Sequence, residues 1–306
     1  MASHPSSAPS ATEPTPRIDS ELSALKDAVS VALEYAKELG TSAAEVAISK
    51  QQGLSVSTRE KEVETVEFNK DGALGITIYR DGRKGSSSTS DLSPEAIRQA
   101  VKAADGIAKY TSEDPFSGLA DPALMAQDIR DLELYHPQDI DAEELAQLAI
   151  RAEEASLSVD NRIRNSDGAS ANAHTAARVY GNSHGFLNGY CSSRYSLSCV
   201  VIGQESDGNM QRDYDYTVAR KYHDLLSPEA VGLQAANKTL SRLDARKIAT
   251  AKMPVLFAPE LATGLMGHLI GAISGSSIYR KSSFLMGALN TQIFPDWFSI
   301  EEQPHL

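Results

Sequence analysis

The sequence predicts an α+β protein in which antiparallel sheets are flanked by helices. Three observations support this prediction. Runs of alternating apolar and polar residues are interrupted by Asp-Gly pairs, which are strong signals of a β-hairpin. Segments with apolar residues at helical spacing precede and follow these runs. Helices and strands therefore occur in blocks, as they do in α+β domains.

The first block begins with a helix predicted over residues 20–39, where Leu, Val and Ala recur at helical spacing and Gly40 follows as a stop. Residues 45–90 then predict an antiparallel meander of four or five strands. Its turns are expected at Asp71-Gly72 and at Asp81-Gly82.

A second helix is predicted from Ser93-Pro94-Glu95 to about Tyr110, because a capping residue, a first-turn proline and an acid suit a helix N-terminus. A long connection over residues 111–137 follows. A third helix is expected from Asp141 to about Leu157.

The second half repeats this order of elements. Strands are predicted over residues 163–166, 170–180, 186–202 and 210–218, with turns at 181–185 and 207–209. Ser227-Pro228-Glu229 predicts another helix start, a short apolar strand is expected over 254–258, and a further helix begins near Pro259. The predicted organisation is a disordered tail (1–18), an N-terminal α/β domain (19–137) and a second α/β domain (138–306).

Composition excludes several classes of function. The net charge of −12 and the lack of a basic run argue against nucleic acid as a partner. No apolar run reaches the length of about 20 residues that spans a bilayer, so no membrane role is expected. Cys191 and Cys199 lie on one predicted strand, about 26 Å apart, and are not expected to form a disulfide. The protein is therefore predicted to be cytoplasmic.

The helix from Pro259 has two unusual features. Gly267, Gly271 and Gly275 form a line at i, i+4, i+8, and each interior glycine costs a helix about 0.8–1.0 kcal/mol relative to alanine. Such a line suggests close packing against another backbone, so the helix is predicted to be buried. His268 is its one histidine, and it is either a buried, hydrogen-bonded side chain or the remnant of a metal-binding pair.

Other chemistry in the sequence is weaker. His174 and His184 have no acidic or cysteine partner at ligand spacing, and His136 and His223 are expected at the surface. No Gly-x-Ser-x-Gly elbow or phosphate-binding loop is present. Polar, aromatic strands carry Arg194 and the run from Arg212 to Tyr216. Their faces are either ordinary solvated surfaces or a surface that docks an extended peptide.

Four blocks of the sequence resemble the PmbA/TldD family of modulators of DNA gyrase, and several resemble its PmbA (TldE) branch. These are Phe68-Asn69-Lys70-Asp71-Gly72-Ala73-Leu74-Gly75-Ile76, Gly181-Asn182-Ser183-His184-Gly185, Ala262-Thr263-Gly264-Leu265-Met266-Gly267-His268-Leu269 and Ser276-Ser277-Ile278-Tyr279-Arg280-Lys281-Ser282. The resemblance extends from about residue 20 to the last residue.

The resemblance implies a bacterial, cytoplasmic metallopeptidase system in which this chain pairs with a TldD-like subunit and acts on unfolded peptides, including peptide-antibiotic precursors and antitoxins. In the TldD branch the helix carries His-Glu-x-x-x-His, two zinc ligands and a carboxylate that activates water. Here Thr263, Gly264 and His268 occupy those positions. Because threonine is a poor zinc ligand and glycine is no base, no catalytic or metal residue is expected in this chain, and the zinc is expected in the partner.

The resemblance also implies that the C-terminal domain of the family, which supplies a late cysteine ligand in TldD, is missing here, as in a fragment or a split gene. Three functions follow as hypotheses. The first is a non-catalytic subunit of a two-chain zinc metallopeptidase. The second is a self-sufficient peptidase in which His174 or His184 joins His268. The third is an interaction or regulatory module without a proteolytic role.

Overall fold

The structure is a computed structural model that describes residues 17–305. It divides into two compact units, Met1–Ala245 and Arg246–Leu306, and each is described by itself. The predicted disordered tail lies outside the described residues except for Arg17 and Ile18. The predicted boundary between residues 137 and 138 stays a prediction.

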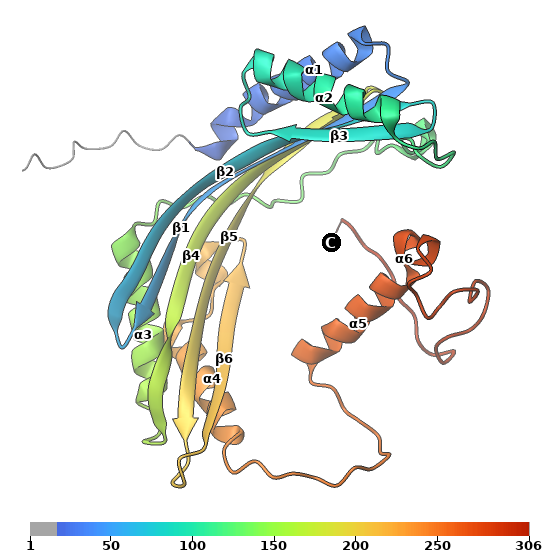
Figure 1. Ribbon diagram of the computed structural model, residues 1–306. Coiled ribbons are helices and arrows are strands. Elements are labelled where there is room, and N and C mark those ends of the chain that lie inside the picture. The colour runs from blue at the N-terminus through green and yellow to red at the C-terminus, as the bar shows by residue number, and fades with distance from the viewer. Residues whose placement is uncertain (1–16, 306) are drawn as a thin grey trace, which may run out of the picture. The chain divides into compact units, whose positions relative to one another are not determined.

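A single antiparallel sheet of six strands organises the first unit (Figure 1). Its strand order is β3-β2-β1-β4-β5-β6, so the central pair β1–β4 joins two distant parts of the chain. The strands are β1 (Ala43–Arg59), β2 (Glu62–Arg80), β3 (Arg83–Thr89), β4 (Ile163–Asn182), β5 (Leu187–Gln204) and β6 (Met210–Ala219).

Helices cover one face of this sheet, a pair at each end (Figure 1). The helices are α1 (Leu22–Glu38), α2 (Pro94–Tyr110), α3 (Ala142–Leu157) and α4 (Pro228–Ser241), with short 3-10 turns at Ile18–Glu21, Pro122–Leu124 and Tyr222–Asp224. The predicted starts are confirmed: Ser93, Asp141 and Ser227 each accept a hydrogen bond from a backbone N–H of the first turn. Such caps satisfy N–H groups that the helix itself leaves unpaired.

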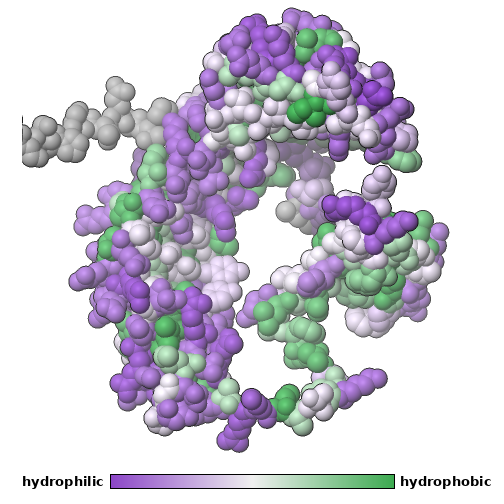
Figure 2. Space-filling model, in the orientation of Figure 1, coloured by the Kyte–Doolittle hydropathy of each residue, from purple (hydrophilic) through white to green (hydrophobic). Residues whose placement is uncertain are grey.

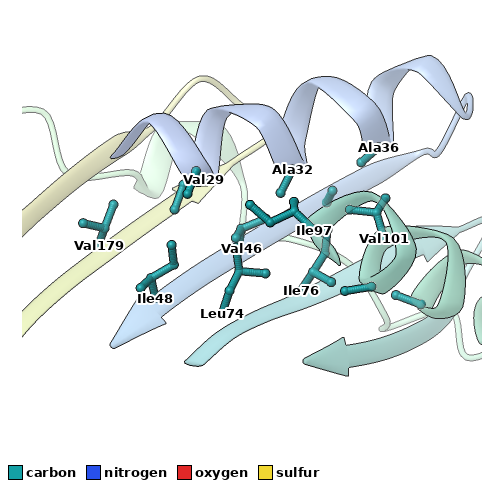
Figure 3. Close-up of a cluster of buried hydrophobic side chains, with 14 of the residues drawn as sticks. Val29, Ala32, Ala36, Val46, Ile48, Leu74, Ile76, Ile97, Val101 and Val179 are labelled. Atoms are coloured by element: carbon teal, nitrogen blue, oxygen red, sulfur yellow. The ribbon is translucent and has the colours of Figure 1, made fainter. Parts of the chain in front are cut away.

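Two hydrophobic cores lie between the helices and the sheet. The first packs α1 and α2 against β1, β2 and β4, with Val29, Val46 and Ile76 among its buried residues (Figure 3). The second packs α3 and α4 against the other end of β1, β4 and β5, around Leu145 and Leu197. Alternate residues of each strand enter these cores, so the remaining residues line the opposite face, which carries no helix of this unit. We call it the open face.

The meander prediction was wrong in its strand number. Residues 43–89 form three strands, because Asp71 and Gly72 lie inside β2 and pair with Gln51 and Lys50 of β1. The hairpin predicted at Asp81-Gly82 is confirmed, and both residues have the positive φ that a tight turn requires. The long ladder with β1 outweighs the local turn preference at Asp71-Gly72.

The strands predicted over residues 163–166 and 170–180 are one continuous strand, β4. The strand continues past Gly168, whose φ of 105° accompanies an irregularity in the register with β5. Glycine adopts this conformation without the steric cost that a side chain adds. A side chain here would also lie 2.5 Å from the carbonyl oxygen of Thr58.

The second unit contains α5 (Pro259–Ile273) and α6 (Gly275–Tyr279). Residues 246–258 form no strand, so the strand predicted over 254–258 is wrong. The predicted burial of α5 is also wrong within this chain, since Ala272 is its single buried residue. Apolar side chains lie at the surface of α5 (Figure 2), including Leu261, Leu265 and Ile270. The apolar residues of α5 indicate a surface suited to burial, but they do not identify the group that covers it.

Among residues 17–305, no helix combines the length and the hydrophobicity that a membrane span needs.

Candidate functional site

Helix α5 carries the three residues that stand at the metal-helix positions. Thr263 donates its hydroxyl to the carbonyl oxygen of Glu260 at 3.1 Å, an ordinary contact within a helix. Gly264 contributes no side chain, and His268 is exposed. Within the described part of the chain, no group of three or more His, Cys, Asp or Glu side chains is placed to hold a metal ion.

This donor set does not fit a catalytic zinc ion. Such a site needs three protein ligands and an open position for water. A single exposed imidazole with a threonine hydroxyl that already donates to the backbone falls short of that number. No catalytic step through zinc is therefore derived for this chain.

The glycine line of α5 is open. A Cβ atom built at Gly267, Gly271 or Gly275 would meet no heavy atom within 4 Å. Contact with this line by another chain remains a prediction.

His174 lies on the open face, on β4, directly opposite Gly53 of β1. Its Nε2 is 3.2 Å from the hydroxyl oxygen of Ser55, and its Nδ1 is buried with no hydrogen-bond partner among the described residues. Burial, and secondly the charge of Arg194, lower the pKa of His174 and so favour its neutral form. The ring lies so close to Gly53 that a Cβ there would be 2.2 Å from Nδ1.

His184 lies in the turn after β4, ten residues beyond His174. At roughly 3.3 Å per residue the two rings are separated by about 30 Å along the strand. They therefore do not form a ligand pair.

The block Gly181-Asn182-Ser183-His184-Gly185 has a structural role. The Oδ1 atom of Asn182 accepts hydrogen bonds from the backbone N–H groups of His184 and Phe186 and so closes the turn. Ser183 bonds to both backbone groups of Ala44, which ties the turn to β1. No reactive group of this block is placed for catalysis.

A polar cluster that the sequence did not predict lies on the open face, at the end of the sheet that α1 and α2 cover on the other face. Glu45 accepts hydrogen bonds from the hydroxyls of Tyr79 at 2.7 Å and Tyr180 at 3.0 Å. Burial, and then the hydrogen bond to Glu45, raise the pKa of Tyr79. Because these residues come from β2, β1 and β4, no spacing in the sequence brings them together.

A cavity with a volume of about 550 Å³ lies on the helix-covered side of the sheet. Its lining residues include Arg17, Phe68, Tyr135, Asp139, Asp141, Glu144, Thr175 and Tyr195. The segment that closes it is tied down by Tyr195, whose hydroxyl donates to the carbonyl oxygen of His136 and accepts from the backbone N–H of Gln138.

The polar residues 212–216 of β6 alternate between the two faces of the sheet. Asp213 and Asp215 face α4 and form ion pairs with Arg242 and Lys238, so they have a structural role. Tyr214 and Tyr216 point to the open side, are about half exposed, and stack with ring centroids 6.2 Å apart. Peptide docking at this edge strand stays a prediction.

Three family models match consecutive parts of the chain. They describe PmbA/TldA metallopeptidase domain 1 (residues 44–108), the central domain (135–243) and the C-terminal domain (250–306). The chain belongs to the PmbA/TldD metallopeptidase family, as the sequence blocks predicted.

Two relatives are similar over nearly all of the chain. It is 55% identical over 290 residues to metalloprotease PmbA of Escherichia coli O157:H7, which covers 95% of this chain and 64% of that protein. It is 55% identical over 282 residues to a PmbA homologue of Haemophilus influenzae, which covers 92% and 62%. The chain thus spans somewhat less than two thirds of the length of these relatives.

Solved structures share the fold. A modulator of DNA gyrase from Bacteroides thetaiotaomicron superposes with a TM-score of 0.78 at 26% identity, over 85% of this chain and 60% of that one. TldE from Thermococcus kodakarensis superposes with a TM-score of 0.67 at 17% identity, over 85% and 58%, and shows the fold alone.

The prediction that the C-terminal domain is missing is not supported. The model of that domain matches residues 250–306, which contain α5 and α6. The matched part of the domain begins at residue 250, before α5, so this domain does not depend on a late cysteine to be recognised.

Proposed function

We propose that this chain is a PmbA/TldE-like, non-catalytic subunit of a cytoplasmic two-chain zinc metallopeptidase. It holds unfolded peptide while a TldD-like partner supplies the zinc and cleaves. The observation that carries the proposal is the state of α5, where Thr263 donates to the backbone, Gly264 has no side chain and His268 stands alone. Metal-assisted hydrolysis needs an activated water and several ligands, and these positions supply neither.

Two further features support a role beside a partner. The line Gly267, Gly271 and Gly275 leaves a smooth helix surface on which another backbone can approach closely. The surface around it is apolar, with Leu261, Leu265 and Ile270 exposed, as is common for surfaces that another protein covers.

The proposal is tested by co-expressing the chain with a TldD-like partner and measuring cleavage of a labelled unfolded peptide. Cleavage is expected with both chains together and not with this chain alone. His268→Ala and Thr263→Ala chains should support the same rate, because neither residue is a ligand in this account. Gly271→Leu should reduce complex formation, since its side chain obstructs the glycine line.

Two outcomes favour the alternatives. A partner that cleaves at the same rate without this chain favours an interaction or regulatory module. Cleavage by this chain alone, lost in His268→Ala, favours a self-sufficient metallopeptidase.

A further inference from the structure

Part of the open face on β4 and β5 is lined by small side chains. Ala176 of β4 pairs with Ser192 of β5 there, and Gln51 of β1 lies opposite Ala176, between Ser49 and Gly53. The strand backbones are therefore covered by little side-chain bulk there. An extended chain can lie close against such a surface.

Two arginines stand in this region, Arg178 on β4 and Arg194 on β5. Both are exposed, and among residues 17–305 neither has an ion pair or a hydrogen bond from its guanidinium. By contrast, Arg212 on the same face is neutralised by Asp167 at 2.6 Å. In a chain with a net charge of −12, two unpaired cations on one face are a local reversal of charge.

The register fixes their spacing. Arg178 lies opposite Tyr190, and Arg194 is four residues further along β5, opposite His174. At roughly 3.3 Å per residue this is about 13 Å along the strands. An extended peptide with acidic side chains at positions i and i+4 presents two carboxylates on one side at the same separation.

His174 lies opposite Arg194 on the neighbouring strand, and its Nε2 is 3.2 Å from the hydroxyl oxygen of Ser55. Acidic residues also share the face. Glu45 of β1 accepts hydrogen bonds from Tyr79 and Tyr180, and Asp167 pairs with Arg212. Glu67 and Asp71 lie on β2, separated from Arg194 by β1 and β4.

We infer that Arg178 and Arg194 form a subsite for an extended peptide carrying two carboxylates spaced i and i+4. Guanidinium groups bind carboxylates through paired, charge-assisted hydrogen bonds, and the small side chains between them admit the peptide backbone. This inference rests on the proposed peptide-holding function and adds a preference for acidic segments.

The test uses the full chain and two labelled, otherwise neutral peptides, one with Glu at i and i+4 and one with Gln at both positions. Fluorescence anisotropy should show the Glu peptide binding about tenfold or more tightly than the Gln peptide, with the difference shrinking as salt is added. Arg178→Gln/Arg194→Gln should remove the difference. Arg98→Gln, which removes one positive charge from α2 on the helix-covered side, should leave it unchanged.

Equal binding of the two peptides overturns the inference, as does an unchanged preference in the double variant with an unchanged melting temperature. Preferential binding of a single-stranded oligonucleotide in place of the Glu peptide overturns it as well. A two-chain complex that cleaves peptides without any acidic preference leaves the proposed function standing and rejects this subsite alone.

Discussion

Glu153 of α3 accepts a hydrogen bond at 2.7 Å from the backbone N–H of Glu60, in the turn between β1 and β2. The Glu153 side chain is fully buried, and its second oxygen accepts from the N–H of Lys61 at 2.9 Å. Glu60 and Lys61 both have positive φ, which costs energy in residues other than glycine. One carboxylate thus holds a strained turn against the second core.

Replacing this carboxylate by an amide tests that role. Glu153→Gln should lower the free energy of unfolding by about 1–3 kcal/mol. The amide oxygen can accept from one of the two N–H groups, but the amide NH₂ cannot accept from the other. The measurement is urea unfolding followed by circular dichroism. Glu154→Gln, on the exposed side of the same helix, is the control and should change stability by about 0.5 kcal/mol or less.

The ion pairs of Asp105 make the free energy of unfolding depend on pH. It is buried on α2 and pairs with Arg80 of β2 and with Lys109. Burial by itself raises the pKa of this carboxyl, but the hydrogen bonds from Arg80 and Lys109 outweigh it and hold the pKa below its usual value. The folded state therefore releases this proton more readily than the unfolded state.

The stabilisation from Asp105 is consequently complete above the unfolded pKa of about 4 and is lost as the pH falls through the lower folded value. Asp105→Asn should destabilise the chain at pH 7, by about 3 kcal/mol for a broken buried pair. The gap between wild type and variant should narrow in melting experiments as the pH falls from 7 to about 3. A gap that stays constant over this range contradicts the assignment.

Two glycines in helices predict opposite effects of the same substitution. A Cβ at Gly232 of α4 would lie 2.0 Å from the carbonyl oxygen of Ala152 on α3, so Gly232→Ala should force the two helices apart and cost about 1–3 kcal/mol. Gly106 of α2 has open space around it, so Gly106→Ala should stabilise by up to about 1 kcal/mol. Thermal unfolding of both variants, compared with wild type, checks the signs.

The two cysteines should differ in reactivity. Burial raises the pKa of the Cys199 thiol to about 11, so roughly one molecule in a thousand is a thiolate at pH 8. Cys191 is half-buried, and burial raises its pKa too. A thiol-reactive dye should label Cys191 first and Cys199 only after unfolding, and Cys191→Ser should abolish the native-state reaction. Loss of both thiols to a disulfide would contradict the structure.

Local chemistry in the sequence predicted most of the helices. The caps at Ser93, Asp141 and Ser227 act within one turn, so their neighbours in the sequence are sufficient to identify them. Pairing across the sheet was not predictable in this way. Asp71-Gly72 has the composition of a turn, and only the long-range ladder with β1 makes it part of a strand.

The functional residues fall into the same two groups, those that neighbour each other in the sequence and those that only the fold brings together. Thr263, Gly264 and His268 lie within two turns of one helix, so the motif comparison located them on α5 without a structure. Two other groups combine residues from different strands. They are the polar cluster of Glu45, Tyr79 and Tyr180, and the arginine pair Arg178 and Arg194. Their proximity depends on register, which the sequence does not encode locally.

We propose that this chain holds no catalytic zinc. The most direct measurement is the zinc content of the purified chain alone, by mass spectrometry after exhaustive dialysis, for wild type and for His268→Ala. We expect far less than one zinc ion per chain in both proteins. One tightly held zinc ion per wild-type chain, lost in His268→Ala, would contradict it.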